Sequence, residues 1–341
     1  MIIEHLYAET FGTHIGKYSK RLKITQKGQT LAEAPLLHLQ SVQVLSRGIS
    51  ISADAIQACC GRGIPIVFLT DNGRTYASLY AAGLTGTVIT RREQLLAYYD
   101  ERGVKTAVTV AHGKIQNQES TLRYLAKNRK TSSPEVYEYL TEAANALRDS
   151  CAALDRLAQP NCLDDVRGTI MGIEGNAGRI YWGAVSQVLP PEYEWPGRKG
   201  RGAQDPLNSL LNYGYGILYS RIEQAAILAG LDPYAGFLHA DRSGKPSLVL
   251  DLIEEFRQIV VDRLVIGLAA RRYQVGQQSD YLLDDATRRD FAEKVIGHLE
   301  STTRYDGKRY PIRFIIQNQA RLLAAYLRGK TDTYKPFRAT W

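Results

Sequence analysis

The sequence predicts an α+β protein, in which a small N-terminal β-rich domain precedes a larger all-α C-terminal domain. The chain has 341 residues, which is enough for two domains of roughly 150 residues each. Short runs of alternating β-branched and apolar residues fill the first ninety or so residues. From about Arg91 onward, long segments with helical periodicity replace them. We therefore place a β-rich domain at 1–90 and a helical domain at 91–341.

The N-terminal region contains strand-like segments around one short helix. Alternating apolar residues predict strands at 1–9, 21–26 and 35–46. Residues 51–63 predict a helix with Ser52 as its N-cap and Gly61 near its end. Residues 63–81 then predict a strand, an Asp-Asn-Gly turn and a second strand, which is a typical hairpin pattern.

Long helices are predicted in the C-terminal region, because the helical period continues there over several turns. The four longest cover 132–158, 163–189, 205–230 and 247–272, and two more lie near 285–299 and 310–327. Ser133 precedes a proline at the start of the first. Asp205 is the expected cap of the third, which ends at Gly230, and Ser247 is the expected cap of the fourth.

The charge of the chain favours an anionic partner. Formal net charge is +8 and the isoelectric point is about 9.2, which suits nucleic acid or a membrane surface. The chain does not open with a basic stretch and an apolar core, and its apolar runs fall short of the ~20 residues that span a bilayer. The four cysteines include no C-x-x-C pair, which argues against a zinc finger. We expect a cytoplasmic protein that is not attached to a membrane.

Three carboxylates interrupt the apolar sequence of the fourth predicted helix. Asp251 lies three residues before Glu254 and four before Glu255, so all three can share one helix face. A divalent cation between them would remove their repulsion. Oxygen-rich sites with one imidazole suit Mg²⁺ or Mn²⁺ better than zinc. A solvated acidic face, with Arg257 and Arg263 as neighbours, explains the spacing equally well.

Another carboxylate, Glu174, lies in a glycine-rich part of the second predicted helix. Each helical glycine costs about 1 kcal/mol relative to alanine, so several together indicate close approach to another backbone or to a ligand. Glu174 and Gly178 are four residues apart and share a face, which leaves little side-chain bulk beside the carboxylate. The simpler alternative is that Glu174 pairs with Arg179 or another local cation.

A single histidine, His239, ends the apolar stretch GFLH. Alone, it is best explained as a core histidine whose hydrogen bonds are satisfied. Together with Glu174 and the carboxylates of the fourth helix, it could hold a divalent cation that stabilises the transition state of phosphodiester transfer. Basic residues near these elements would attract a phosphate backbone. They are Arg179, Arg198, Lys199, Arg201, Arg242 and Lys245.

Three stretches carry a family resemblance: IEGNAGRIYW, LNSLLNYGYGILYSRIEQAAILAGLDPYAGFLH and SLVLDLIEEFR. Together they resemble the spacer-acquisition integrases of CRISPR systems, the CRISPR-associated protein one family. The resemblance covers nearly the whole chain, since the strand-rich start is similar to the family's β domain and the remainder to its helical domain. The strings GLDPYAGFLH and DLIEEFR, at this separation, are its most specific part.

The resemblance implies a catalytic metal site made of Glu174, His239 and Glu254. Asp251 is expected in the metal-binding set as well, at an acidic position that supports the site. Glu255 is expected to lie outside the set of ligands. The implied cofactor is Mg²⁺ or Mn²⁺.

The resemblance also implies strand transfer on double-stranded DNA. In the family, the 3′-hydroxyl of a short captured DNA attacks a phosphodiester at the edge of a CRISPR repeat, and hydroxide in its place gives endonuclease cleavage. The implied protein partners are a second copy of the chain, in a homodimer formed by the β domain, and CRISPR-associated protein two, in a heterohexamer. Candidate DNA contacts are the six basic residues above, Tyr219 beside the active site, and Arg47, Arg62 and Arg74 in the β domain.

Two other functions stay open on the sequence. A stand-alone metal-dependent nuclease for branched or single-stranded DNA would use the same ligands. A non-catalytic DNA-binding scaffold of the same fold would have lost at least one of them, whereas Glu174, His239 and Glu254 are all present.

Overall fold

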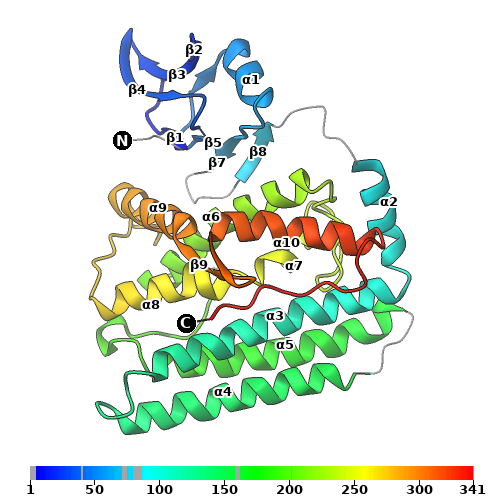
Figure 1. Ribbon diagram of the computed structural model, residues 1–341. Helices are drawn as coiled ribbons and strands as arrows, with labels where there is room; N and C mark the ends of the chain where they lie inside the picture. Colours follow the sequence, from blue (N-terminus) through cyan, green and yellow to red (C-terminus); the bar gives the residue numbers. More distant parts are fainter. Residues whose placement is uncertain are drawn as a thin grey trace. The chain divides into compact units, whose positions relative to one another are not determined.

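The chain forms two compact units, Met1–Thr85 and Gly86–Trp341. The computed structural model describes residues 5–39, 41–70, 75–79, 87–157, 162–200 and 202–340. Strands dominate the first unit and helices the second (Figure 1), which confirms the predicted α+β order. Among the described residues, no helix is both long enough and apolar enough to cross a bilayer.

The described part of the first unit holds two four-stranded sheets. One has the order β1-β5-β7-β8, in which β1, β5 and β7 are parallel and β8 is antiparallel to β7. The other has the order β4-β3-β2-β6. The strands are β1 (His5–Ala8), β2 (His14–Tyr18), β3 (Arg21–Gln26), β4 (Gln29–Pro35), β5 (Ser41–Val44), β6 (Ser50–Ile51), β7 (Ile66–Leu69) and β8 (Thr75–Leu79).

Local sequence signals explain the elements of this unit. α1 (Ala53–Cys60) begins after Ser52, whose hydroxyl accepts a hydrogen bond from Ala55 N at 3.2 Å, as predicted. β7 and β8 form the predicted antiparallel pair, while the Asp-Asn-Gly turn lies outside the described residues. One apolar core joins the two sheets, with Ile24 of β3 and Val42 of β5 among its buried side chains.

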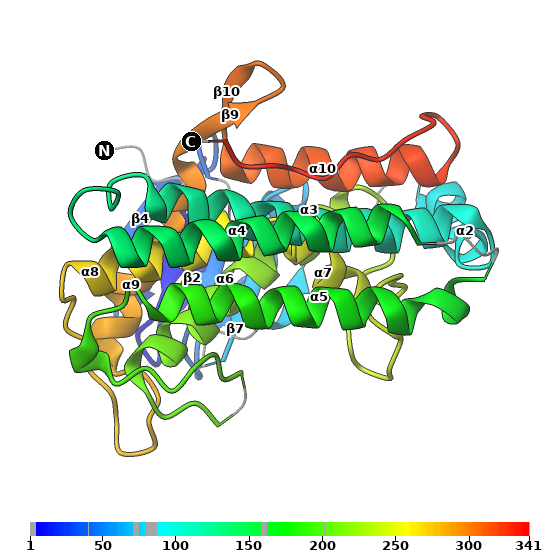
Figure 2. The same cartoon turned by 90° about the horizontal axis from the view of Figure 1, so that it is seen from below.

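Long helices make up most of the second unit. They are α2 (Thr87–Ala97), α3 (Glu101–Ala126), α4 (Pro134–Asp155), α5 (Leu163–Ser186), the 3₁₀ turn Pro191–Tyr193, α6 (Pro206–Leu228), α7 (Ser247–Ile253), α8 (Arg263–Ala270), α9 (Asp285–Glu300) and α10 (Ile312–Leu327). α3, α4 and α5 each pack against the other two and form a three-helix bundle (Figures 1 and 2). α3 also contacts α7, and α6 contacts α7, α9 and α10. α3 therefore connects the three-helix bundle to the rest of the unit.

The ends of α6 follow the predicted signals. Asp205 caps the helix by accepting a hydrogen bond from Asn208 N at 2.9 Å. Pro206 occupies the first turn. Gly230 lies just beyond the end with φ +80°, a left-handed conformation that costs glycine little.

The fourth predicted helix is not continuous, so this prediction is wrong. α7 ends at Ile253, a turn covers 254–256, and Gln258–Asp262 form a π-helical segment before α8. In the turn, the backbone N of Glu254 and of Phe256 donates to the carbonyl three residues earlier, as in a 3₁₀ helix. The hydrogen-bond spacing is therefore shorter than in an α-helix in the turn and longer in the π segment that follows. Such segments are frequent at functional sites.

The second unit is mostly helical, as predicted, but it also contains one hairpin that was not predicted. β9 (Thr302–Tyr305) and β10 (Lys308–Pro311) form an antiparallel hairpin between α9 and α10. Asp306 and Gly307 have φ values of 46° and 77°. Two consecutive positive φ values are what a two-residue type I′ turn requires, and Asp-Gly is among its preferred sequences.

Candidate active site

Lys114 brings together two of the three predicted ligands. Glu174 lies on α5, Glu254 directly follows α7, and Lys114 lies in the middle of α3. The Lys114 ammonium forms an ion pair with Glu174 Oε1 and lies 2.7 Å from Glu254 Oε2. Three helices therefore meet at one lysine that the motifs did not single out.

The sequence does contain a signal for Lys114. It lies between Gly113 and Ile115 on a helix whose buried residues follow a helical period, so its side chain is directed into the unit and is only 16% exposed. Burial favours the neutral amine, but the charges of Glu254 and Glu174 outweigh it and raise the pKa of Lys114. A lysine in such a position indicates a buried carboxylate partner.

Glu254 is a buried carboxylate between two cations. Its side chain is 4% exposed, and Arg257 Nε donates to Oε1 at 3.0 Å. Oε2 faces the Lys114 ammonium but accepts no hydrogen bond of good geometry from any described residue. Burial raises the pKa of Glu254, yet Arg257, Lys114 and His239 outweigh burial and hold this pKa at about 2. The carboxylate is therefore ionised at neutral pH, with Oε2 able to take a further ligand.

A buried polar network fixes Arg257. The guanidinium carbon lies 4.5 Å from the ring centroid of Tyr215 on α6. Tyr215 Oη donates to Asp262 in the π segment, as does Tyr181 Oη of α5 at 3.0 Å. Burial raises the pKa of Asp262 despite these hydrogen bonds. α5, α6 and the π segment thus hold the residue that orients Glu254.

Asp251 fixes the backbone and the ring of His239 through hydrogen bonds. Its carboxylate is fully buried and accepts hydrogen bonds from the backbone N of Phe237 at 2.6 Å, Leu238 at 3.1 Å and His239 at 2.9 Å. His239 Nδ1 lies 2.8 Å from Asp251 Oδ1. A carboxylate partner puts the proton on Nδ1 and leaves the lone pair of Nε2 for a ligand. Both oxygens of Asp251 are already engaged, so it acts on the site through His239.

The loop that carries His239 packs tightly against the start of α7. A Cβ at Gly236 would lie only 2.6 Å from Ser247 Cβ, so this position needs glycine. Ser247 Oγ lies 2.6 Å from Tyr234 O and 2.5 Å from Asp241 Oδ1. Pro246, and not the predicted Ser247, is the N-cap of α7. The Ser247 hydroxyl fastens the loop instead of capping the helix.

Glu255 has different partners from its neighbour. Oε1 accepts a hydrogen bond from Tyr334 Oη, and Oε2 accepts one from Phe337 N at 2.8 Å. Burial raises the pKa of Glu255 to about 7, against the effect of these hydrogen bonds. Asn117 on α3 also bonds to Phe337 O at 2.9 Å and Ala339 N at 2.8 Å. Glu255 therefore anchors residues 334–340, the 334–340 segment, to the helices.

The glycine-rich face of α5 is open. At four glycines a Cβ would meet no other atom within 4 Å: Gly168, Gly172, Gly175 and Gly178. The predicted approach of another backbone is therefore absent among the described residues, and approach of a ligand stays a prediction. Arg179 donates to Asn176 Oδ1 at 3.0 Å, so pairing of Glu174 with Arg179 is wrong.

The predicted DNA contacts have varied surroundings. Arg198 is bound to Asn208 Oδ1 at 3.0 Å and Asn212 Oδ1 at 2.7 Å, so it fastens its loop to α6. The exposed candidates are Arg47, Arg62, Arg179, Lys199 and Arg242, and the partly buried ones are Tyr219 and Lys245. Arg74 and Arg201 lie outside the described residues.

The chemical types of the three predicted ligands, Glu174, His239 and Glu254, fit a divalent cation. Two carboxylates and an imidazole suit Mg²⁺ or Mn²⁺, and Glu254 Oε2 is buried without a hydrogen bond. As arranged, the cation between the carboxylates is the Lys114 ammonium. No three His, Cys, Asp or Glu side chains of the described residues are already gathered around one point. A divalent cation would therefore compete with Lys114.

Comparison with known proteins decides the family. The profile of the family described as CRISPR associated protein Cas1 matches residues 6–296. This chain belongs to the Cas1 family. A Cas1 relative, the "CRISPR-associated endonuclease Cas1 1" of Archaeoglobus fulgidus, is 39% identical over 347 residues, 98% of this chain and 99% of that protein. The family resemblance of the sequence is thus confirmed.

Solved structures share the Cas1 fold. The structure titled "Casposase bound to integration product" has a TM-score of 0.80 at 22% identity and covers 98% of this chain and 93% of that one. The "Cas6-RT-Cas1--Cas2 complex" has a TM-score of 0.76 at 19% identity and covers 99% of this chain and 36% of that one. At these identities the likeness concerns the fold alone.

Proposed function

We propose that this Cas1-family chain is a spacer-acquisition integrase, which joins the 3′-hydroxyl of a short captured DNA to a CRISPR repeat by transesterification. The observation that carries the proposal is the sharing of one cation by Glu174 and Glu254, with His239 oriented beside them. The names of the relatives support it, since one is called an endonuclease and another is bound to an integration product.

Glu174, His239 and Glu254 would hold Mg²⁺ or Mn²⁺, which supplies a Lewis acid for the reacting phosphodiester. The chain's own residues prepare this site. Arg257 keeps Glu254 ionised and oriented, and Asp251 keeps the Nε2 lone pair of His239 available. Both effects are in place before any ligand binds, so little reorganisation is required when it does.

Lys114 has a second use in this proposal. Its ammonium neutralises two carboxylates in the protein alone, and it must leave at least one of them when a divalent cation binds. A displaced ammonium beside the site is a suitable partner for a phosphate oxygen. Lys114 would then assist in neutralising the negative charge of the DNA at the reacting position.

The open face of α5 gives DNA a route to Glu174. Gly178 lies one turn beyond Glu174 on the same face, and a Cβ there would meet nothing within 4 Å. A sugar–phosphate backbone can therefore approach without meeting side chains. Double-stranded DNA, a second copy of the chain and the partner Cas2 complete the proposed assembly, a heterohexamer in the cytoplasm, and the neighbour titled as a Cas1–Cas2 complex supports it.

Strand transfer of a short 3′-hydroxyl duplex into supercoiled DNA tests the proposal. We expect joining with Mn²⁺ and the partner protein, and none with EDTA or with His239→Ala, while that variant still binds DNA. Metal-dependent cleavage without joining, even with the partner present, would identify a stand-alone nuclease. DNA binding with neither cleavage nor joining would identify a non-catalytic scaffold.

A further inference from the structure

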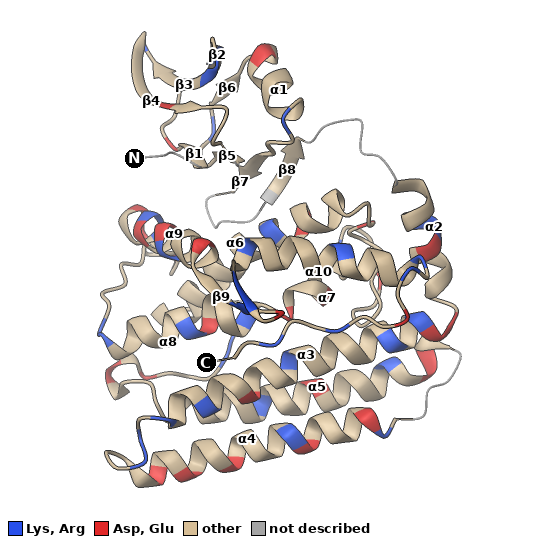
Figure 3. Cartoon of the chain, in the orientation of Figure 1, with Lys and Arg blue, Asp and Glu red and all other residues tan. Residues whose placement is uncertain are grey.

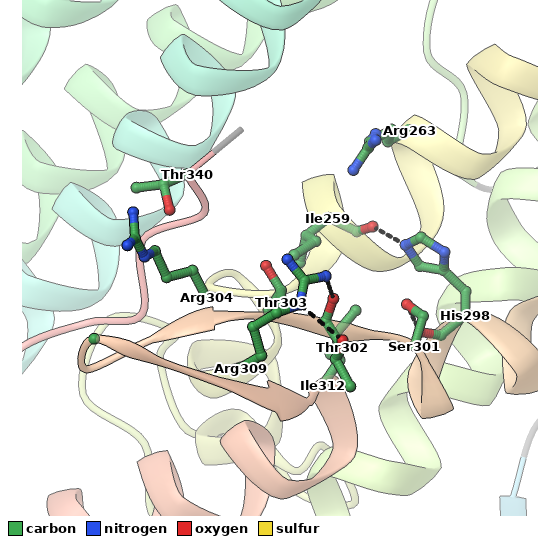
Figure 4. A pocket seen from close by; sticks show the side chains of 11 residues that line it. Ile259, Arg263, His298, Ser301, Thr302, Thr303, Arg304, Arg309, Ile312 and Thr340 are labelled. Carbon is green, nitrogen blue, oxygen red and sulfur yellow. Dashed lines mark hydrogen bonds between the residues drawn. The ribbon is translucent and has the colours of Figure 1, made fainter.

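A basic hollow beside the β9–β10 hairpin has no part in the chemistry proposed above. It encloses about 840 Å³ and is bordered by the hairpin, the start of α8, the end of α9 and Thr340 (Figure 4). Its cationic lining residues are Arg263, Arg304 and Arg309, while burial lowers the pKa of His298, which also lines it. None of its described lining residues is acidic, so the hollow attracts anions.

Two of these arginines are placed in an unfavourable arrangement. Arg304 and Arg309 are directly opposite each other in the β9–β10 register (Figure 4). Like charges in that position destabilise an antiparallel pair. Hydrogen bonds from Arg309 Nε to Thr302 Oγ1, at 3.1 Å, and from Nη2 to Thr302 O, at 2.7 Å, hold the Arg309 guanidinium there. Neither arginine pairs with a carboxylate of the described residues, so an anion between them would remove the repulsion.

A hydroxyl in the same hollow lacks a partner. Thr303 is only 8% exposed, and its side chain lines the hollow between the arginines (Figure 4). Its Oγ1 makes no hydrogen bond with any described residue. This hydroxyl is therefore available to donate to an anionic oxygen in the hollow.

A second basic hollow adjoins the first at Thr340, which lines both. It encloses about 550 Å³ and is lined by Arg123, Lys127 and Lys130 together with Tyr124. Glu119 pairs with Arg123 at 2.9 Å, which leaves the two exposed lysines without a carboxylate partner. The guanidinium of Arg263 lies 4.4 Å from the Tyr124 ring centroid and so connects the two hollows.

Both hollows lie in the same direction from the active site. Along α3, Arg123 is nine residues beyond Lys114, which is about 14 Å of helix. In the neighbouring segment, Arg263 is likewise nine residues beyond Glu254. The two paths run in parallel, since Gly113 of α3 packs near Glu255 and Tyr124 packs near Arg263. At about 3.4 Å per nucleotide, a strand at the active site would reach the hollows after about four nucleotides.

We propose that the two hollows form one phosphate-binding surface, which holds the sugar–phosphate backbone of a DNA strand a few nucleotides from the reacting phosphodiester. This inference rests on the proposed function, because it takes DNA as the substrate. The basic side chains are distributed over two adjoining hollows, which suits successive phosphates better than one small anion. In Figure 3 the ribbon is blue at Lys and Arg positions, including those of the β9–β10 hairpin.

The test measures DNA binding without catalysis. A labelled single strand of about 12 nucleotides, roughly three times the separation above, is titrated in EDTA between about 50 and 200 mM salt. We expect Arg304→Ser with Arg309→Ser to lower the slope of log K against log salt by roughly 1.4, about 0.7 for each lost phosphate contact. Lys127→Ser with Lys130→Ser should lower it similarly.

The matched control is Lys308→Ser with Arg321→Ser. These residues are exposed, one of them on the same hairpin, they line neither hollow, and their loss changes net charge equally. The control should keep nearly the slope of the unmodified chain, and melting temperatures should show that all variants fold.

Each other outcome contradicts a defined part of the proposal. Equal slopes for the control and both double variants would overturn the surface and leave the integrase function intact. A change for one hollow only would overturn their joint use. Inorganic phosphate that displaces the strand through the hollows at low millimolar concentration would identify a small-anion site instead. Failure of the unmodified chain to bind DNA would overturn the proposed function itself.

Discussion

Glu254 and Glu255 are neighbours in sequence and both are buried, but their carboxyl groups have different partners and pKa shifts of opposite sign. Glu254 faces Lys114 and Arg257, and these cations lower its pKa to about 2 despite burial. Among the described residues, the Glu255 carboxyl group accepts hydrogen bonds from the neutral donors Tyr334 Oη and Phe337 N, and burial raises its pKa to about 7. The difference teaches that charge on a buried carboxylate depends on nearby cations more than on burial itself. In this turn, Glu254 is placed to bind a cation, whereas Glu255 anchors the 334–340 segment.

The largest expected effect separates the two residues by activity. Glu254→Gln should reduce strand transfer below detection, because the isosteric amide cannot neutralise a cation. Glu255→Gln should keep most of the activity, since it lies behind the site and its amide can still hydrogen-bond to the 334–340 segment. Joining assays with Mn²⁺ measure both, with DNA binding in EDTA as a check on folding. Equal losses would show that Glu254 is not the ligand.

The next effect concerns the cation that faces Glu254. Lys114→Gln should lower the free energy of unfolding in EDTA by about 3–5 kcal/mol, because it leaves buried carboxylates without their partner. Mn²⁺ should then stabilise the variant more than it stabilises the unmodified chain, since the competing ammonium is gone. Thermal unfolding with and without Mn²⁺ measures the two shifts. A smaller Mn²⁺ effect in the variant would mean that Lys114 does not compete with the ion.

A third comparison uses pH, because the two carboxyl groups have pKa shifts of opposite sign. The raised pKa of Glu255 stabilises the fold below about pH 4.5, and this contribution is lost as pH rises to about 7, a change of about 3 kcal/mol. The lowered pKa of Glu254 has the opposite effect on stability. Its contribution to the stability of the fold is present above about pH 4.5 and is lost as pH falls towards 2. Glu255→Gln should therefore gain stability relative to the unmodified chain between pH 5 and 8.

Urea unfolding followed by tryptophan fluorescence checks this expectation, since Trp182 and Trp195 both lie in the helical unit. If the difference between variant and unmodified chain does not change with pH, the Glu255 carboxyl group titrates normally.

Asp251 should show a smaller effect that acts through His239. Asp251→Asn keeps the shape but weakens the hydrogen bonds to the loop, so we expect activity to fall about 10–100-fold. Joining assays with Mn²⁺ measure this loss, with DNA binding in EDTA as a check on folding. A loss as complete as that of Glu254→Gln would instead indicate that Asp251 is itself a ligand.

The smallest effect tests access along α5. Gly178→Leu should raise helix stability by about 1 kcal/mol, because leucine favours helices and a Cβ meets nothing there. Strand transfer should nevertheless fall, since the new side chain lies beside Glu174. The smaller substitution Gly178→Ala is the control, and it should stabilise the helix with little loss of activity. Full activity of the leucine variant would show that DNA does not approach this face.

Much of the fold was predictable because its signals are local. Caps and terminal prolines defined the ends of α6, and the alternation of short runs predicted the strands of the first unit. The interruption after α7 was not predictable, since the apolar period continues through Gln258–Asp262 and the π turn depends on Tyr181 and Tyr215 from other helices. The β9–β10 hairpin was missed although its Asp-Gly turn is a local signal.

The candidate site, like the fold, was predictable from the sequence only in part. The family resemblance implied Glu174, His239 and Glu254 as one site, and Glu174 and Glu254 meet at a shared cation. The motifs did not include Lys114. Its place among the buried positions of α3 indicates a carboxylate partner, but the identity of its two partners depends on packing between helices. The anchoring role of Glu255 also depends on residues far away in sequence, Tyr334 and Phe337.

The contacts of the 334–340 segment have a consequence for synthesis of the protein. Asn117, Glu255 and the stacked ring of Phe256 are satisfied by residues from this segment, with the Phe256 and Phe337 rings 5.4 Å apart. The ribosome makes α3 and α7 long before it makes their partners. Until residues 334–340 emerge, the Glu255 carboxyl group lacks both of its donors, and Asn117 keeps its bond to Glu255 O but lacks its partners at Phe337 and Ala339. The helical unit therefore reaches its final form only after residues 334–340 have left the ribosome, and until then the turn that carries Glu254 lacks these contacts.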